Sequence, residues 1–228
     1  MGISKFGQLG LALLLSVTAM THFSGCSGKA VTDEDPAVLY QEAEDDIKSD
    51  HFQIALDKLR VIKNKHPYSK QAVDAQLRIA DVFFMQESFA EAAASYEAFK
   101  DLHPKHERVS YAMNRQSLSY YNDIPGNRAR DLTPAFKALD SYEDFVKRFP
   151  LTPEAAEARG KIVEIRKILA DKELYIANFY LKQELLEAAK GRYEKILAVY
   201  PETTTATEAK DKLTKVQTQI DKAGAKKE

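Results

Sequence analysis

The chain has 228 residues, of which 44% are hydrophobic and 29% are charged. Its 33 lysines and arginines nearly balance its 34 aspartates and glutamates, and the formal net charge of −1 argues against a nucleic-acid-binding protein, which would show a basic face. Nine glycines and eight prolines are few for this length, while alanine, leucine, glutamate and lysine are plentiful. This composition favours helices, so we expect an all-α protein that binds no nucleic acid.

Residues 1–25 have the composition of a cleaved secretory signal. Lys5 is their only charge, and the apolar run over 9–19 is shorter than the about 20 residues that span a bilayer. The end of this segment, Phe23-Ser24-Gly25-Cys26, resembles the bacterial lipoprotein signal, in which a small residue precedes an invariant cysteine. The resemblance implies cleavage before Cys26 and acylation of that residue; the alternative is an ordinary signal peptide with an incidental cysteine.

The segment after the signal is predicted to be a lipidated polar tether over residues 26–35 that holds the chain to the membrane. An aspartate after the cysteine tends to retain such lipoproteins in the inner membrane, so Ser27 suggests the outer membrane. Apart from the covalent lipid on Cys26, we expect no cofactor. At the other end of the chain, residues 221–228 are predicted to be a disordered tail.

Four segments between these ends share one spacing. Relative to a central alanine, mostly apolar residues recur three positions before and four and seven positions after it, and a proline follows at the twelfth position. Steps of three and four place these residues on one face of a helix, and the proline ends that helix. The central alanines are Ala55, Ala92, Ala138 and Ala189. A small residue marks a partner helix upstream of each one: Ala43, Ala80, Ser117 and Ala177.

This spacing predicts a tetratricopeptide-like solenoid of antiparallel helix pairs, with an unrelated helical bundle as the alternative. We expect the solenoid to span 36–220, with units at about 36–69, 70–106, 107–152 and 153–202 and a C-terminal capping helix over 203–220. The extra residues from Pro153 to Leu169 are themselves helical in pattern. We expect them to continue into the helix that holds Tyr175 and Tyr180.

No enzymatic motif is present in the sequence: there is no Gly-x-Ser-x-Gly, Walker loop, His-Glu-x-x-His or dinucleotide fingerprint. We therefore expect a protein that is not an enzyme. His103 and His106 have a spacing that could ligate a metal, but Pro104 lies between them. The simpler interpretation is packing of a flat ring, because the position before the repeat proline holds His66, His103, Phe149 and Tyr200.

A solenoid without catalytic groups offers surface for binding. Its concave side suits an extended peptide or a segment of another protein. On the repeat template, the inward positions form a candidate client groove of Tyr40, Glu44, Leu77, Asp81 and Phe84. Mixed aromatic and acidic character suits a segment with apolar and polar side chains; the alternative for Leu77 and Phe84 is that they only pack between repeats.

More specific motifs occur in the second half of the chain. They are Arg130-Asp131, Ala135-Phe136, Tyr142 to Pro150, Arg159, Leu169-Ala170, Glu173, Ala177, Phe179-Tyr180, Ala188-Ala189, Arg192 and Tyr200-Pro201. With them the chain resembles the BamD family, the tetratricopeptide lipoproteins of the outer-membrane β-barrel assembly machinery, over roughly residues 26–215. Two positions depart from the family pattern: Glu184 stands where glycine is expected, and Leu186 where an aromatic residue is common.

The resemblance implies a lipid-anchored scaffold on the periplasmic face of the cell outer membrane. Such proteins hold the periplasmic domain of a BamA-type barrel insertase through their C-terminal repeats, bind segments of unfolded outer-membrane protein clients with their N-terminal repeats, and work with accessory assembly lipoproteins. The candidate partner-binding residues are Arg192, which matches the family motif, Glu187 and Lys195. For Arg192 the alternative is pairing within its own helix. For the protein, it is a scaffold role in another envelope complex, at a pilus secretin or in cell-wall coordination.

Overall fold

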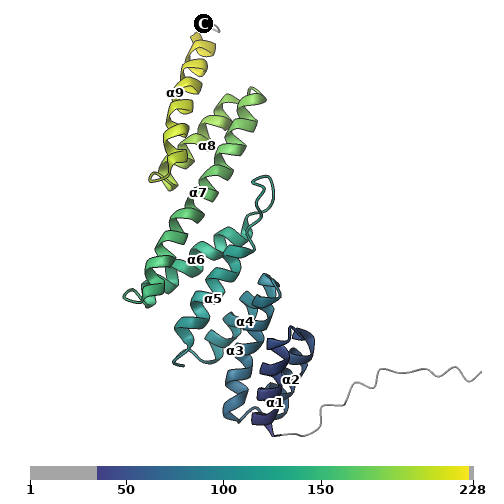
Figure 1. Ribbon diagram of the computed structural model, residues 1–228. Helices are drawn as coiled ribbons and strands as arrows, with labels where there is room; N and C mark the ends of the chain where they lie inside the picture. Colours follow the sequence, from purple (N-terminus) through teal and green to yellow (C-terminus); the bar gives the residue numbers. More distant parts are fainter. Residues whose placement is uncertain (1–34, 226–228) are drawn as a thin grey trace, which may run out of the picture. The chain divides into compact units, whose positions relative to one another are not determined.

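The computed structural model describes residues 35–225, and every regular element within that range is an α-helix (Figure 1). The prediction of an all-α protein is therefore confirmed. Cys26, the signal segment and most of the expected tether lie outside the described residues. Within the described range, no helix combines the length and the apolar character needed to cross a membrane. The helices are α1 (Pro36–Lys48), α2 (Phe52–Lys65), α3 (Lys70–Met85), α4 (Phe89–Leu102), α5 (Val109–Asn122), α6 (Thr133–Arg148), α7 (Pro153–Lys182), α8 (Leu186–Val199) and α9 (Thr204–Ala225).

The helices form antiparallel pairs that stack in chain order. Each helix packs against the next one along the chain, and α1 also contacts α3, α5 contacts α7, and α7 contacts α9. We call α1, α3, α5 and α7 the A helices of their pairs and α2, α4, α6 and α8 the B helices. Because α9 packs on both α7 and α8, it covers the end of the last pair, as a capping helix does.

The repeated positions form the core between these helices. All four central alanines are completely buried, and their lack of a longer side chain lets the neighbouring helix approach closely. The tyrosines four residues after them, Tyr96, Tyr142 and Tyr193, are buried as well. Burying a large apolar side chain stabilises the fold by about 1.5–3 kcal/mol, so these repeated contacts hold each pair together and join it to the next.

Each B helix ends in the same way, one residue before its repeat proline. The four C-cap residues His66, His103, Phe149 and Tyr200 have φ between −128° and −123° and ψ between 46° and 55°. The ring of His103 lies 5.0 Å from that of Phe99, and the ring of Phe149 lies 5.7 Å from that of Phe145. His103 Nε2 also lies 3.0 Å from Gln76 Oε1. At His103 and Phe149, ring packing therefore accounts for this position, as the sequence interpretation expects.

The turns from A to B helices use a left-handed residue in three of the four pairs. Asp50, Glu87 and Glu184 have φ of 58°, 57° and 57°, a region that costs residues with a Cβ about 1–2 kcal/mol. In the last of these turns the N–H of Leu185 donates to Tyr180 O at 3.0 Å, which closes a Schellman motif around Glu184. The glycine expected at position 184 is thus replaced without a change of turn geometry.

Helices α7 and α9 are the long elements. Helix α7 runs without interruption from Pro153 to Lys182, as expected. Helix α9 continues past Ile220 to Ala225, so the expected disordered tail does not begin at 221. The physical reason is local, because Asp221 accepts a hydrogen bond from Gln217 Nε2 at 2.8 Å and no proline interrupts the segment.

Candidate functional site

The A helices of the first three pairs are joined by a polar network on the face where they meet. Arg78 on α3 binds Glu44 on α1 through one edge of its guanidinium, with Nε 2.7 Å from Oε1 and Nη2 2.8 Å from Oε2. This bidentate pair is partly buried, and it fixes the distance between the first two units.

Asp81 is the buried centre of the same network. Its Oδ1 accepts hydrogen bonds from Tyr96 OH at 2.6 Å and from Tyr111 OH at 2.8 Å. Arg78 Nη1 lies 3.5 Å from the other carboxylate oxygen. The guanidinium of Arg115, on α5, donates to Tyr96 OH at 3.3 Å. A carboxylate that is only 3% exposed is therefore matched by two hydroxyl donors and two cations.

Burial and the neighbouring carboxylates shift the tyrosines of this network. The pKa of Tyr40 is raised to about 12, first by burial and then by the charges of Glu44 and Asp74. Burial followed by the charge of Asp81 raises the pKa of Tyr96 and of Tyr111 in the same way. All three hydroxyls therefore stay protonated and able to donate at neutral pH.

Two of the five residues predicted to line the client groove are buried in the structure. Leu77 is 0% exposed and packs in a core cluster with Ala80 and Tyr96, so it cannot contact a client. Asp81 is likewise closed off by its donors. Glu44 and Phe84 remain partly accessible, but Arg78 neutralises the first, and Arg115 stacks on the ring of the second at 3.7 Å. The surviving surface is mixed in charge and not acidic.

The contacts follow a register in the repeats that the sequence interpretation missed. The residue after the small A-helix position is Glu44, Asp81, Leu118 or Asn178. Where this residue is polar, it accepts hydrogen bonds from its own pair or from the helix that follows the pair. Glu44 accepts from Arg78, Asp81 from Tyr96, and Asn178 from Tyr193 and from Lys212 on α9. One signal of this register was available in the sequence: Arg78 and Arg115 each stand two residues before the small A-helix position, Ala80 or Ser117.

A second polar centre joins α7 to α8. Glu173 is nearly buried, and its Oε2 accepts from Arg192 Nη1 at 2.9 Å while its Oε1 accepts from Lys195 Nζ at 2.6 Å. Burial by itself would raise the pKa of Glu173, but the hydrogen bonds from Lys195 and Arg192 outweigh it and hold that pKa below its usual value. Arg192 thus pairs across two helices and not within its own.

This centre carries more positive than negative charge. One carboxylate is shared by Arg192 and Lys195, whose side chains are 35% and 46% exposed. Tyr175 and Phe179, two and six residues after Glu173, are exposed on another face of α7. A partly accessible cationic pair that shares one carboxylate can bind a carboxylate of a protein partner.

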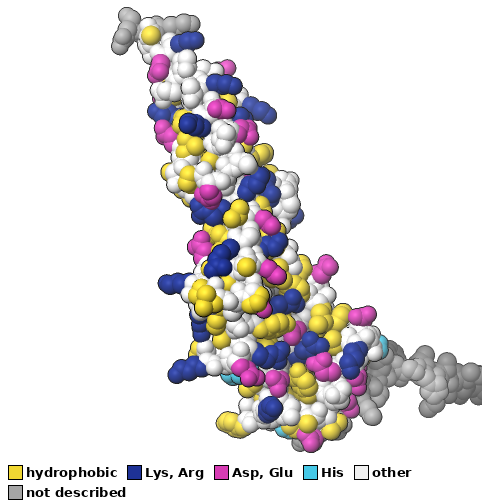
Figure 2. Space-filling model, turned by 60° about the vertical axis from the view of Figure 1, so that its left-hand side comes forward, with side chains coloured by type: hydrophobic (Ala, Val, Ile, Leu, Met, Phe, Trp, Pro, Cys, Tyr) yellow, Lys and Arg dark blue, Asp and Glu magenta, His cyan; other side chains and the backbone are white. Residues whose placement is uncertain are grey.

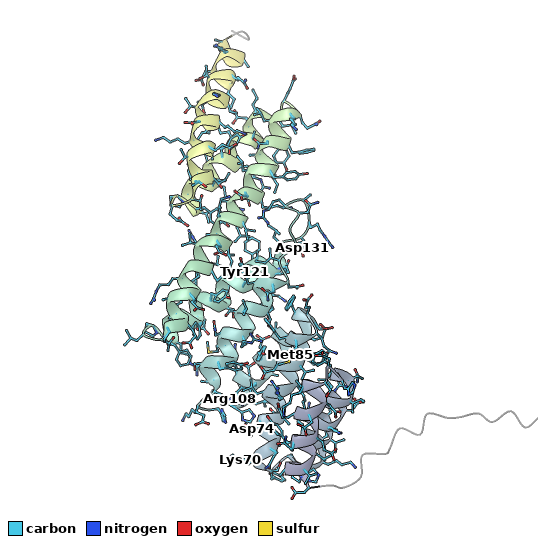
Figure 3. The ribbon with its side chains drawn as sticks, viewed as in Figure 1. Lys70, Asp74, Met85, Arg108, Tyr121 and Asp131 are labelled. Atoms are coloured by element: carbon cyan, nitrogen blue, oxygen red, sulfur yellow. The ribbon has the colours of Figure 1, made fainter. Side chains whose placement is uncertain are left out.

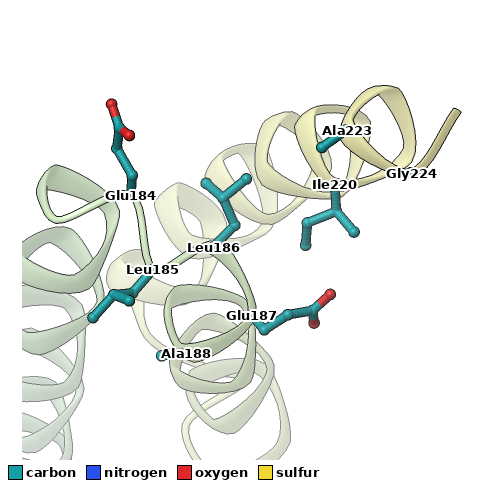
Figure 4. A pocket seen from close by; sticks show the side chains of 8 residues that line it. All are labelled: Glu184, Leu185, Leu186, Glu187, Ala188, Ile220, Ala223 and Gly224. Atoms are coloured by element: carbon teal, nitrogen blue, oxygen red, sulfur yellow. The ribbon is translucent and has the colours of Figure 1, made fainter. Parts of the chain in front are cut away.

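Glu187 does not join Arg192 and Lys195. It lines a separate hollow of about 620 Å³ between the start of α8 and the end of α9 (Figure 4). Leu186 and Ile220 stand on the two helices beside this hollow, and the Glu184 carboxylate points away from it. The candidate partner-binding residues therefore belong to two different places on the surface.

Comparison with known proteins agrees with this architecture. The family model YfiO, described as outer membrane lipoprotein, matches residues 32–228. Proteins named outer membrane protein assembly factor BamD are similar to the chain: 27% identity in Neisseria meningitidis (86% of this chain, 80% of that protein), 30% in Caulobacter vibrioides (86% and 66%) and 31% in Rickettsia prowazekii (76% and 68%). A solved tetratricopeptide repeat protein from Parabacteroides merdae aligns over 82% of this chain and 61% of that one, at a TM-score of 0.42 and 17% identity. The stacked helix pairs and the match over nearly all of the described residues lead to one conclusion: the chain belongs to the BamD family of outer membrane lipoproteins.

Proposed function

We propose that the protein is a non-enzymatic scaffold of the outer-membrane β-barrel assembly machinery, anchored through acylated Cys26 on the periplasmic face of the outer membrane. The observation that carries this proposal is the family match over residues 32–228, whose curated relatives are named outer membrane protein assembly factors. The apolar run and the cysteine after it supply the expected anchor.

The surface of α7 and α8 around Glu173 is the proposed contact with the periplasmic domain of a BamA-type insertase. Arg192 and Lys195 together outweigh the single carboxylate that they share. A carboxylate from the partner would complete the charge balance of this surface. The entropic cost of ordering Arg192 on binding is low because Glu173 already holds its side chain in place.

The face of α1, α3 and α5 is the proposed contact with unfolded clients. Tyr40, Glu44 and Phe84 remain of the five residues expected there, and Arg78, Tyr111 and Arg115 join them. Alternating cations, hydroxyls and rings can bind the backbone and the aromatic side chains of an extended segment.

The experiment is affinity purification of the tagged, full-length chain from detergent-solubilised outer membranes, followed by mass spectrometry. We expect a barrel insertase and accessory assembly lipoproteins as the dominant partners. Recovery of a pilus secretin or of cell-wall enzymes in place of the insertase would contradict the proposal and favour a scaffold role in another envelope complex. Cys26→Ser is expected to release the protein from the membrane fraction without loss of helix content.

A further inference from the structure

One edge of the solenoid is formed by the connections that lead from a B helix to the next A helix. They are residues 66–69, 103–108, 149–152 and 200–203, and the A helices and α9 all begin there (Figure 1). Arg148, the last residue of α6, donates from Nη2 to Pro104 O at 2.7 Å and so ties the end of α6 to the second connection. Figure 3 places Lys70, Asp74 and Arg108 at this edge, and Met85 and Asp131 at the opposite ends of the helices. We call the first three connections, 66–69, 103–108 and 149–152, the connector edge.

The connector edge carries the most exposed large hydrophobic side chains of the described residues. Tyr68 is 101% exposed, Leu151 is 96% exposed and Leu102, at the end of α4, is 67% exposed. Tyr68 and Leu151 each follow a repeat proline, so both occupy the same register in their connections. A single exposed apolar residue needs no explanation. The same exposure at matching positions of the first and third connections, with Leu102 beside the second, indicates a surface that is covered in use.

Charge is also separated between the two edges. Around the connector edge, the net charge is plus three over residues 63–70 (three lysines), plus one over 100–108 (Lys100, Lys105 and Arg108 against two acids) and plus one over 147–154. The opposite turns give minus two over 45–51, minus two over 86–91, zero over 123–131 and minus one over 182–187. In Figure 2, hydrophobic, basic and acidic side chains are interspersed over the lower and middle part of the side that comes forward.

We propose that the connector edge lies against the lipid surface of the membrane. Tyr68, Leu102 and Leu151 would enter the interfacial layer, and the lysines beside them would face anionic headgroups. This inference rests on the proposed lipid anchor for its choice of occupant. Helix α1 begins at this same edge, after the N-cap Asp35, and Cys26 stands only nine residues earlier. A span of that length reaches roughly 30 Å at most, so an acylated Cys26 would hold the start of α1, at the first unit, within that distance of the bilayer.

The fourth connection marks where the proposed contact ends. Its residue after the proline is Glu202, which is held by Arg166, and Arg166 Nη2 also donates to Val199 O at 2.6 Å. Tyr200 in the same connection is buried. This connection offers neither an exposed ring nor an unbalanced cation, so the membrane contact is confined to the first three units and leaves α7 and α8 for a protein partner.

The test uses the mature chain from residue 26 with Cys26→Ser, so that binding does not depend on the acyl chain. It is mixed with vesicles of phosphatidylethanolamine and phosphatidylglycerol, or of phosphatidylcholine alone, at low salt, and bound protein is measured by flotation. We expect binding to the anionic vesicles, about fivefold weaker for each of Lys105→Gln and Lys147→Gln. The pair Tyr68→Ser and Leu151→Ser should weaken it about tenfold. The matched pair on the opposite edge, Met85→Ser and Leu185→Ser, should leave it unchanged.

A second measurement reports the site of contact. The chain contains no tryptophan, so Tyr68→Trp and Leu185→Trp each introduce a unique fluorophore. Addition of anionic vesicles should shift the emission of Tyr68→Trp to the blue and leave that of Leu185→Trp unchanged. Absent binding, or equal losses for both serine pairs, would overturn the proposal. So would cross-linking of position 68 to a protein in outer membranes without vesicle binding. Failure of the anchor itself would appear separately, as wild-type protein in the soluble fraction.

Discussion

The ion pair between Glu173 and Arg192 allows the stabilising role of Arg192 to be separated from its proposed binding role. Arg192→Glu would place a second carboxylate beside Glu173 and leave Lys195 as the only cation there. Two unit charges 4 Å apart interact by about 1 kcal/mol in water and about 4 kcal/mol at an effective dielectric constant of 20. Because Arg192 is a third exposed, its attraction to Glu173 lies near the lower value, and reversal of its sign costs about 2 kcal/mol in total.

The assay combines thermal unfolding, followed by circular dichroism, with capture of the partner from solubilised membranes. At about 2–4 °C per kcal/mol for a domain of this size, Arg192→Glu should lower Tm by about 4–8 °C. The double variant Glu173→Arg with Arg192→Glu restores an opposite-charge pair and should recover at least half of that loss. Capture of the insertase should stay lost in the double variant, because position 192 still carries a carboxylate.

Two outcomes would refute this reasoning. If Arg192→Glu leaves Tm unchanged, the pair across α7 and α8 contributes nothing to stability. If the double variant recovers both stability and capture, Arg192 acts only within the fold and does not contact the partner. Lys190→Glu serves as the control for charge reversal, because Lys190 lies on the same helix but makes no contact with Glu173 within the described residues.

Four further predictions concern stability. Asp81→Ala leaves the hydroxyls of Tyr96 and Tyr111 without their acceptor, which should cost about 3 kcal/mol in urea unfolding, and a loss below 1 kcal/mol would contradict the network. Gly160→Ala adds a Cβ with nothing within 4 Å and should raise the free energy of unfolding by about 1 kcal/mol. Glu184→Gly removes the Cβ from a residue with positive φ and should also raise Tm. A lower Tm for either variant would contradict its prediction. Since the pKa of Glu173 is lowered in the fold, its stabilisation is present above about pH 4.5 and is lost as the pH falls through the folded value, so the difference in stability between wild type and Glu173→Gln should vanish in acid and not in alkali.

The repeat spacing was sufficient to predict the architecture. An alanine with apolar partners at steps of three and four forms a helix with one buried face, and the proline twelve residues after the alanine stops that helix. This local chemistry recurs four times, so the pairs and their order follow from it without knowledge of distant contacts. The predicted end of the capping helix, by contrast, was wrong. The residues after Ile220 carry no periodic apolar signal, but they continue the helix to Ala225.

For the candidate site, too, some features follow from the sequence and others only from the tertiary structure. The sequence by itself determined the all-α fold, the family and the positions that face into the stack, because each depends on residues that are close along the chain. Only the tertiary structure decided what those positions do: Leu77 and Asp81 are closed off by α4 and α5, and Arg192 is held by a carboxylate nineteen residues away on another helix. Burial and charge pairing depend on which helices meet and at what rotation, and the spacing of residues along one helix does not contain that information.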